Sequence, residues 1–411
     1  MRERGIPLEI ASIAAGGDGV ARTEGMVVFV PRTAPGDVAR VQIARAKRFA
    51  RGELLSLDQP SPARVDPPCP HYTIDRCGGC QIQHLSYDAQ LAAKRVIIGD
   101  ALRRIGRRAV ADPEVEPSDA PWRYRRKLTL HVRRVGEGWI AGLHPYDDPV
   151  GVFDLEDCPI TDERVMAVWR DVRAAFDVLP RERALRVAVR LLDAGASITV
   201  EGARTWRAPE ALLERVPELT EVWWRPEEGS LRRVAARTAE RHAGAAFAQV
   251  NAGVAARLRE RLLARVRLHD PAHVVDAYAG TGATATPLAA DGRRVTAIEL
   301  DRAAVETLRE RLAPPSTVVA GKVEDHIGHA LPADVVLLNP PRTGVDERVT
   351  TALESLRTSV RAVFYVSCDP ATLARDLARL PRYRLVDVRA YDMFPQTAHV
   401  ETLCELVPEA A

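Results

Sequence analysis

The sequence has 411 residues, with 58 basic and 56 acidic side chains and a formal net charge of +2 at pH 7. This near balance does not point to a polyanionic partner, and the length is enough for about two to four domains. No stretch approaches the ~18 apolar residues of a membrane span, and the N-terminus lacks the apolar core of a signal peptide. We therefore expect a cytoplasmic, globular protein that acts as a monomer and does not bind membranes.

The first half of the chain predicts two units. Residues 1–58 contain short alternating apolar runs separated by glycine-rich turns such as Gly16-Gly17-Asp18-Gly19, which indicate a small all-β domain. A proline-rich linker begins at Gln59. Residues 59–240 then combine predicted strands at 127–132, 139–143, 185–191 and 197–200 with predicted helices at 87–105 and 162–179, which is typical of an α+β domain.

From residue 241 to residue 411 the pattern changes to alternating strands and helices. Predicted strands cover 274–278, 294–299, 335–338 and 362–366, and predicted helices cover 284–290 and 303–312. This alternation predicts a doubly wound parallel sheet. Ligands and reacting groups in such sheets gather at the carboxyl ends of the strands.

Cys368 lies at one such strand end, directly before Asp369-Pro370 and a predicted helix. A helix N-terminus favours a thiolate, so the position predicts a reactive cysteine. Cys404 instead belongs to an alternating apolar run and is predicted to be a buried structural residue.

Three further cysteines, Cys69, Cys77 and Cys80, are closely spaced, and Cys158 supplies a fourth. In a reducing compartment this group predicts a metal or cluster site rather than disulfides. The Gly-Gly pair between Cys77 and Cys80 and the proline after Cys158 favour an iron-sulfur cluster. Zinc held by four thiolates remains the alternative.

A glycine-rich loop from Asp276 to Gly282 follows a predicted strand, and Glu299 ends the next strand, where a ribose hydroxyl is usually held. A dinucleotide is one candidate, because Ala285 completes a G-x-G-x-x-A pattern. S-adenosylmethionine is favoured, since an acidic residue precedes the glycines and a second strand end carries Asn339-Pro340-Pro341.

With these motifs the chain resembles the RNA 5-methyluridine (uracil-C5) methyltransferases, in particular the iron-sulfur branch that modifies bacterial 23S ribosomal RNA. The resemblance implies an N-terminal OB-like TRAM β-barrel, an iron-sulfur α+β middle domain and a Rossmann-like methyltransferase domain. It implies roles for matched residues: Cys368 as nucleophile, Glu401 as proton acceptor, Gln249, Tyr278, Ala283, Glu299 and Asn339 at the cofactor, and Cys69, Cys77, Cys80 and Cys158 as ligands of a 4Fe-4S cluster.

Two positions depart from the family pattern. Asn339 stands where the family usually has Asp, and Ala283 stands where it has a polar residue. The asparagine suggests an amino-group RNA methyltransferase as an alternative function. A transfer RNA substrate and an inactive RNA-binding iron-sulfur protein are two further possibilities.

The predicted partner is RNA. Residues 94–134 contain 12 basic and 5 acidic side chains, including Arg123, Arg125, Arg126 and Lys127. Such an excess is typical of a surface that contacts phosphates, although a solvated face has the same composition.

Overall fold

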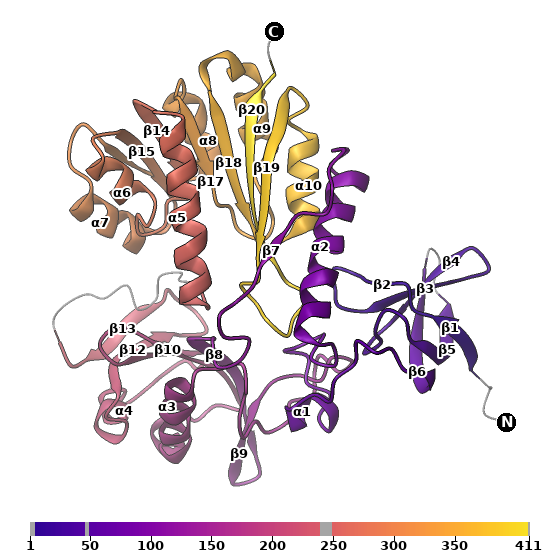
Figure 1. Cartoon of the computed structure of the whole chain (residues 1–411). Helices are drawn as coiled ribbons and strands as arrows, with labels where there is room; N and C mark the ends of the chain where they lie inside the picture. The colour runs from indigo at the N-terminus through magenta and orange to yellow at the C-terminus, as the bar shows by residue number, and fades with distance from the viewer. Residues whose placement is uncertain (1–4, 46–48, 239–248, 410–411) are drawn as a thin grey trace.

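The computed structural model describes residues 5–45, 49–238 and 249–409, which form three sheets (Figure 1). The N-terminal sheet has the strand order β1-β5-β6-β4-β3-β2, and buried valines and alanines form its core. Its strands are β1 (Ile6–Glu9), β2 (Ser12–Ile13), β3 (Gly19–Thr23), β4 (Met26–Val30), β5 (Val38–Arg45) and β6 (Ala50–Gln59). The predicted all-β unit is therefore confirmed.

The predicted linker is packed against this sheet rather than free. The buried carboxylate of Asp37 accepts hydrogen bonds from the backbone N–H of Ser61 at 2.8 Å and from Nη2 of Arg64 at 2.7 Å. Arg32 donates from Nη2 to the carbonyl oxygen of Cys77 at 2.8 Å, and its guanidinium lies 3.3 Å from the ring centroid of Tyr72. These contacts attach the N-terminal sheet to the cysteine-containing segment.

The middle of the chain forms a second sheet with the order β13-β12-β11-β10-β8-β9. Its core includes Trp169 from helix α3, which packs against the buried face of the sheet. The elements are α1 (Pro70–Thr73), α2 (Tyr87–Arg104), β8 (Lys127–Val135), β9 (Gly138–Gly142), α3 (Glu163–Ala174), β10 (Ala184–Leu191), β11 (Ala196–Glu201), α4 (Glu210–Arg215), β12 (Leu219–Arg225) and β13 (Arg232–Ala236).

Helix α3 ends earlier than predicted, at Ala174 instead of residue 179, and a 3-10 turn follows at Phe176–Val178. Leu179 is extended, with φ −70° and ψ 160°. Pro180 explains this, because a residue before proline avoids the helical region.

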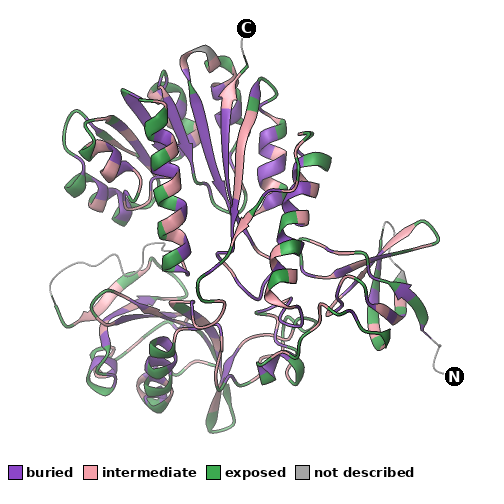
Figure 2. Ribbon diagram, in the orientation of Figure 1, coloured by how far each residue is buried: buried purple, intermediate pink, exposed green. Residues whose placement is uncertain are grey.

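The C-terminal sheet has eight strands in the order β16-β15-β14-β17-β18-β20-β19-β7. Its central strands are buried on both faces and its helices are exposed on their outer sides (Figure 2). The elements are β7 (Val115–Glu116), α5 (Ala252–Leu268), β14 (His273–Ala277), α6 (Ala285–Ala290), β15 (Arg294–Glu299), α7 (Arg302–Arg311), β16 (Thr317–Ala320), α8 (Val323–Ala330), β17 (Val335–Leu338), α9 (Glu347–Ser355), β18 (Ala362–Ser367), α10 (Pro370–Ala378), β19 (Tyr383–Tyr391) and β20 (Glu401–Pro408).

Strand β20 departs from the predicted parallel pattern. It lies between β18 and β19 and is antiparallel to both, whereas β14, β15, β16, β17 and β18 are parallel to one another where they pair. Ser367 pairs with Thr402 across β18 and β20. The start of β20 therefore lies beside the carboxyl end of β18.

The fold class is confirmed as a mixed α/β chain with several sheets, and the domain boundaries at 58 and 240 stay predictions. Strand β7, from the predicted middle unit, pairs with β19 in the C-terminal sheet, and α2 packs on α10. In the part of the chain that the structure describes, no helix is long and apolar enough to cross a membrane.

Candidate active site

Cys368 lies where β18 ends and α10 begins, as predicted. Asp369 caps the helix, because its side chain accepts hydrogen bonds from the backbone N–H of Ala371 at 3.0 Å and of Thr372 at 2.8 Å. Pro370 occupies the first turn, where it needs no N–H partner. The thiol is half-buried and is not part of a disulfide.

Glu401 is the first residue of β20 and is almost fully buried. Since Ser367 pairs with Thr402, the next residues along the two antiparallel strands are Cys368 and Glu401. Burial raises the pKa of Glu401 to about 8, although the nearby guanidinium of Arg342 lowers it. A buried carboxyl group with a pKa close to neutral is suited to moving protons.

The pKa of the Cys368 thiol is shifted in the direction opposite to the expectation. Burial and the neighbouring Glu401 raise the pKa of the thiol, and a hydrogen bond from the Arg342 side chain lowers it by less. The predicted preference for a thiolate, based on the helix N-terminus, is therefore wrong for this structure, because the loss of solvation outweighs the favourable groups. Sequence reasoning did not assign Arg342 a role, although it directly follows the Asn-Pro-Pro motif.

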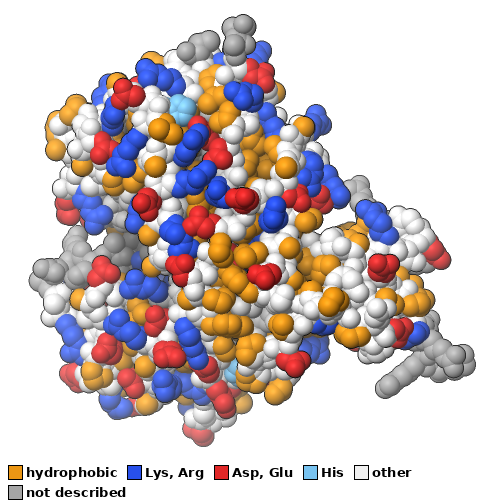
Figure 3. All heavy atoms as spheres, in the orientation of Figure 1, with side chains coloured by type: hydrophobic (Ala, Val, Ile, Leu, Met, Phe, Trp, Pro, Cys, Tyr) orange, Lys and Arg blue, Asp and Glu red, His pale blue; other side chains and the backbone are white. Residues whose placement is uncertain are grey.

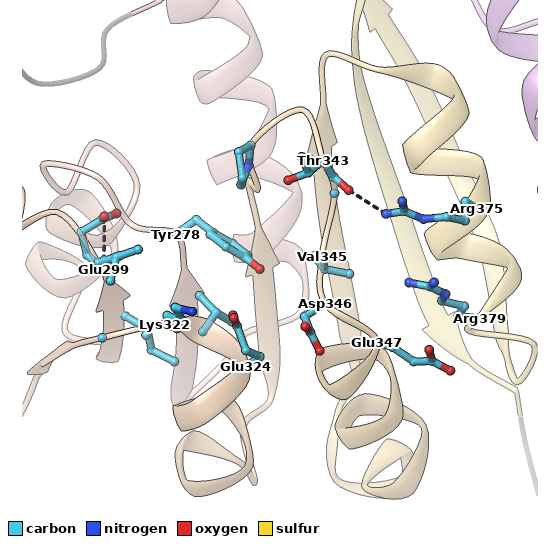
Figure 4. A pocket seen from close by; sticks show the side chains of 16 residues that line it. Tyr278, Glu299, Lys322, Glu324, Thr343, Val345, Asp346, Glu347, Arg375 and Arg379 are labelled. Carbon is cyan, nitrogen blue, oxygen red and sulfur yellow. Dashed lines mark hydrogen bonds between the residues drawn. The ribbon is translucent and has the colours of Figure 1, made fainter.

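A cleft of about 820 Å³ opens at the carboxyl ends of β14, β15 and β17 (Figure 4). Tyr278 and Glu299 line it, as the sequence predicted. One oxygen of Glu299 accepts the backbone N–H of Gly280 at 2.8 Å, and the other accepts those of Leu300 and Asp301 at 2.7 Å. These bonds hold the carboxylate in one orientation at the edge of the cleft.

Tyr278 enters the cleft from a strained position, with a φ of +66°. Such strain in a residue other than glycine is common at binding sites. Asp276 has a supporting role: it is buried and accepts a hydrogen bond from Oγ1 of Thr284. Burial raises the pKa of Asp276 to about 6.

Three of the predicted cofactor residues are not among those that line the cleft: Gln249, Ala283 and Asn339. Part of the motif around Gln249 lies outside the described residues. The cleft instead contains charged side chains that the sequence reasoning missed, namely Lys322, Glu324, Asp346, Glu347, Arg375 and Arg379 (Figure 4). Lys322 and Glu324 follow the end of β16, which is the signal that could have identified these two.

The four predicted cysteine ligands, Cys69, Cys77, Cys80 and Cys158, line one cavity of about 250 Å³. The glycines between Cys77 and Cys80 are closely packed: a Cβ atom on Gly78 would lie 3.1 Å from the carbonyl oxygen of His144, and one on Gly79 would lie 3.3 Å from Cδ1 of Leu143, so either neighbour would have to shift slightly. Burial and the neighbouring thiols raise the pKa of Cys77 to about 11 and also raise the pKa of Cys69 and Cys80. Ionising these thiols together requires a cationic partner.

Within the described ranges, no group of three or more His, Cys, Asp or Glu side chains is arranged to hold a metal ion. The cavity also extends beyond the cysteines to Arg342, Phe394 and His399. The rings of Phe394 and His399 meet edge to face, with centroids 6.0 Å apart.

The predicted basic surface is smaller than its composition suggested. Lys94 is fully buried and paired with Asp392, so it cannot contact a phosphate. Arg108 donates to three carbonyl oxygens of the C-terminal domain, and Arg123 is paired with Asp157 at 2.7 Å. On the face that Figure 3 shows, acidic and basic side chains are interspersed. Arg125 lines the cysteine cavity and remains a candidate for RNA contact.

Comparison with known proteins gives two family matches. Residues 328–407 match the tRNA (Uracil-5-)-methyltransferase family, and residues 6–55 match the TRAM domain. An uncharacterized RNA methyltransferase of Protochlamydia amoebophila is 32% identical over 97% of this chain and 96% of its own length. One of Gloeobacter violaceus is 33% identical over 98% and 96% of the two chains.

Among solved structures, the Pyrococcus abyssi tRNA (uracil-54, C5)-methyltransferase in complex with S-adenosyl-L-homocysteine superposes with a TM-score of 0.72. It is 23% identical and covers 98% of this chain and 100% of its own. At this identity the likeness establishes the fold.

The raised pKa of Cys368 predicts slow alkylation by iodoacetamide near neutral pH and a rate that still increases with pH above the pKa of an ordinary exposed thiol. Arg342→Met should slow the reaction further at each pH, because it removes the group that lowers the pKa. Peptide mapping by mass spectrometry measures both rates, with fully buried Cys404 as the internal unreactive control. Rapid alkylation of Cys368 at pH 7 would contradict the raised pKa of this thiol.

Proposed function

Because the chain belongs to the family of S-adenosylmethionine-dependent RNA (uracil-C5) methyltransferases, we propose that it methylates C5 of a specific uridine through a covalent bond between Cys368 and C6. One observation carries this proposal. The antiparallel register of β18 and β20 brings a half-buried thiol beside a buried carboxyl group of raised pKa.

The cleft lined by Tyr278 and Glu299 is the proposed cofactor site. Glu299 can bind the ribose hydroxyls, because its oxygens accept three backbone N–H groups and have further acceptor capacity. When bound there, the cofactor supplies an electrophilic methyl group on a sulfonium. Roles for Gln249, Ala283 and Asn339 in this site stay predictions.

Cys368 activates the uracil ring. C5 is a poor nucleophile because its electrons are conjugated with the ring carbonyls, and addition of the thiolate to C6 places electron density on C5. The Arg342 side chain lowers the pKa of the thiol and so favours the thiolate, against the effect of burial. The activated C5 would then take the methyl group, and the sulfonium would leave as a neutral thioether.

Glu401 completes the reaction by accepting the proton from C5, after which the thiolate leaves C6 and the ring double bond re-forms. Its burial keeps water away, and its raised pKa makes it a stronger base than an exposed carboxylate. Phe394 and His399 line the adjoining cavity and can stack on a uracil turned out of the RNA chain.

For the substrate we propose 23S ribosomal RNA, held by the TRAM unit and the middle domain. The Cys-Gly-Gly-Cys segment, which resembles that of the ribosomal RNA branch, supports this choice. Transfer RNA is the alternative.

Cys69, Cys77, Cys80 and Cys158 are the proposed ligands of a 4Fe-4S cluster. The shared cavity, the closely packed glycines and the raised thiol pKa values support a bulky cationic group. The Gly-Gly pair between Cys77 and Cys80 and the proline after Cys158 favour the cluster over zinc. We infer a structural role, because the cysteines share their cavity with Phe394 and His399 and the reaction needs no electron transfer.

The covalent mechanism predicts opposite defects in two variants. Cys368→Ala should form neither adduct nor methylated RNA, whereas Glu401→Gln should add and methylate but not remove the C5 proton, so that a methylated adduct accumulates. Mass spectrometry after nuclease digestion detects the adduct. RNA with 5-fluorouridine at the target should trap the wild-type enzyme, since fluorine cannot leave as a proton does.

Cys404→Ala is the matched control. Cys404 is buried in β20, so its replacement should leave adduct formation intact. Full turnover by Cys368→Ala would reject the mechanism and favour an amino-group methyltransferase, which needs no thiol.

The substrate proposal predicts that 5-methyluridine disappears from one position of 23S RNA in cells that lack the gene. Sequencing-based mapping of both RNA classes, with and without the gene, measures this. Restoration by the wild type and not by Cys368→Ala links the loss to catalysis. Loss of the modification from transfer RNA alone would establish transfer RNA as the substrate.

The cluster proposal predicts about four iron and four sulfide per chain after anaerobic purification, with visible absorbance from sulfur-to-iron charge transfer. Cys77→Ser should lose iron, whereas Cys404→Ser should retain it. Stoichiometric zinc in place of iron would disprove the assignment.

A further inference from the structure

The segment 392–400 connects β19 to β20 and leads directly into Glu401. It carries Phe394 and His399, both of which line the cavity beside Arg342. The segment has no regular secondary structure of its own, so its backbone needs partners elsewhere. Those partners therefore determine the position of Glu401, the first residue of β20.

Two glutamines form a reciprocal pair between α2 and this segment. Nε2 of Gln90 donates to Oε1 of Gln396 at 2.9 Å, and the backbone N–H of Gln396 donates to Oε1 of Gln90 at 2.9 Å. Gln90 is 1% exposed and Gln396 is 2% exposed, so water does not compete for these bonds. Gln396 has a φ of +70°, a conformation that persists only where the surroundings determine it.

One helical turn after Gln90, Lys94 makes a second connection. Its ammonium pairs with Asp392, and both side chains have no exposed surface. Nζ also donates to the carbonyl oxygen of Phe394 at 3.0 Å. Positions i and i+4 of a helix lie on one face, so Gln90 and Lys94 reach the same segment together.

Two more contacts come from outside the C-terminal sheet. Tyr124 donates from its hydroxyl to the carbonyl oxygen of Pro395 at 3.0 Å, and the N–H of Ile82 donates to the carbonyl oxygen of Gln396 at 3.2 Å. A buried ion pair is a weak source of stability, because desolvation opposes the attraction between the charges. The hydrogen bonds from Gln90, Lys94, Tyr124 and Ile82 are directional, and together they specify one conformation of the segment.

We propose that Gln90 and Lys94 of α2 are positioning residues for proton removal from C5: they hold the segment 392–400 so that Glu401 lies beside the Cys368 adduct. Neither side chain touches the substrate in this scheme. The proposal rests on the proposed function and assigns the middle domain a part in the last chemical step, in addition to RNA binding.

The test compares Gln90→Ala, Gln396→Ala and the double variant. Each single variant should lower kcat about ten- to a hundredfold, the scale expected for a small misplacement of a catalytic group. The KM for S-adenosylmethionine should not change, and the methylated covalent adduct should accumulate as in Glu401→Gln. The double variant should be no worse than Gln90→Ala, because Gln90→Ala already removes both bonds of the pair, whereas Gln396→Ala removes only the bond to its side-chain oxygen.

Lys94→Met tests the second connection, and Arg265→Met is its matched control. Arg265 pairs through Nε with Glu405 at 2.7 Å, a buried carboxylate also on β20 but remote from the segment. Both variants remove a cation from a buried carboxylate, yet only Lys94→Met should accumulate adduct. Where Gln90→Ala fails to fold, Gln90→Glu retains the oxygen that accepts the Gln396 N–H and should show a smaller defect of the same kind.

Three results would overturn the proposal. These are an unchanged kcat in Gln90→Ala, additive losses in the double variant, and a lower kcat without accumulated adduct in folded Lys94→Met. Binding of S-adenosyl-L-homocysteine and thermal unfolding identify folded variants. A control with the wild-type enzyme distinguishes failure of this proposal from failure of the proposed function. If the wild type forms no adduct with 5-fluorouridine RNA, the covalent mechanism itself is rejected.

Discussion

The antiparallel pairing of β20 with β18 is the constraint on which the site depends. A wholly parallel sheet would start each strand at the edge opposite the carboxyl ends, and Glu401 would then lie far from Cys368. Because β20 runs the other way, its first residue lies beside the last residues of β18, with Ser367 opposite Thr402. The proposed nucleophile and the proposed base, 33 positions apart by residue number, thus become neighbours through backbone hydrogen bonds.

Burial then determines the chemistry of this pair. Desolvation raises the pKa of both Cys368 and Glu401, and the single guanidinium of Arg342 opposes both shifts. The resting site therefore holds its protons more tightly than exposed groups would, which limits unproductive reactions of the thiol. Arg342 reaches the pair from the loop after β17, so a third strand end contributes to the same local field.

The cofactor cleft and the proposed substrate cavity lie on different sides of that loop. Pro341 and Thr343 line the cleft, whereas Arg342 between them lines the substrate cavity, which is the same cavity that the four cysteines line. Alternate residues of one short segment therefore face the two sites that must cooperate. The segment 392–400 closes the second site, and α2 and the cysteine-containing region hold it from the other side.

The sequence alone determined the three kinds of structural unit, the helix cap at Asp369 and the positions of Cys368, Tyr278 and Glu299 at strand ends, because these depend on local periodicity and on turn and cap residues. It also grouped the four cysteines as ligands of one site, and in the structure they line one cavity. It did not determine the direction of β20, the burial of Lys94 or the raised pKa of Cys368. These depend on contacts between residues far apart in the chain: Lys94 appeared to be one cation of a basic surface, and only its pairing with Asp392, 298 positions away, placed it in the interior. Local sequence specifies elements and candidate chemistry, whereas solvation, charge and register at the site arise only when distant segments pack together.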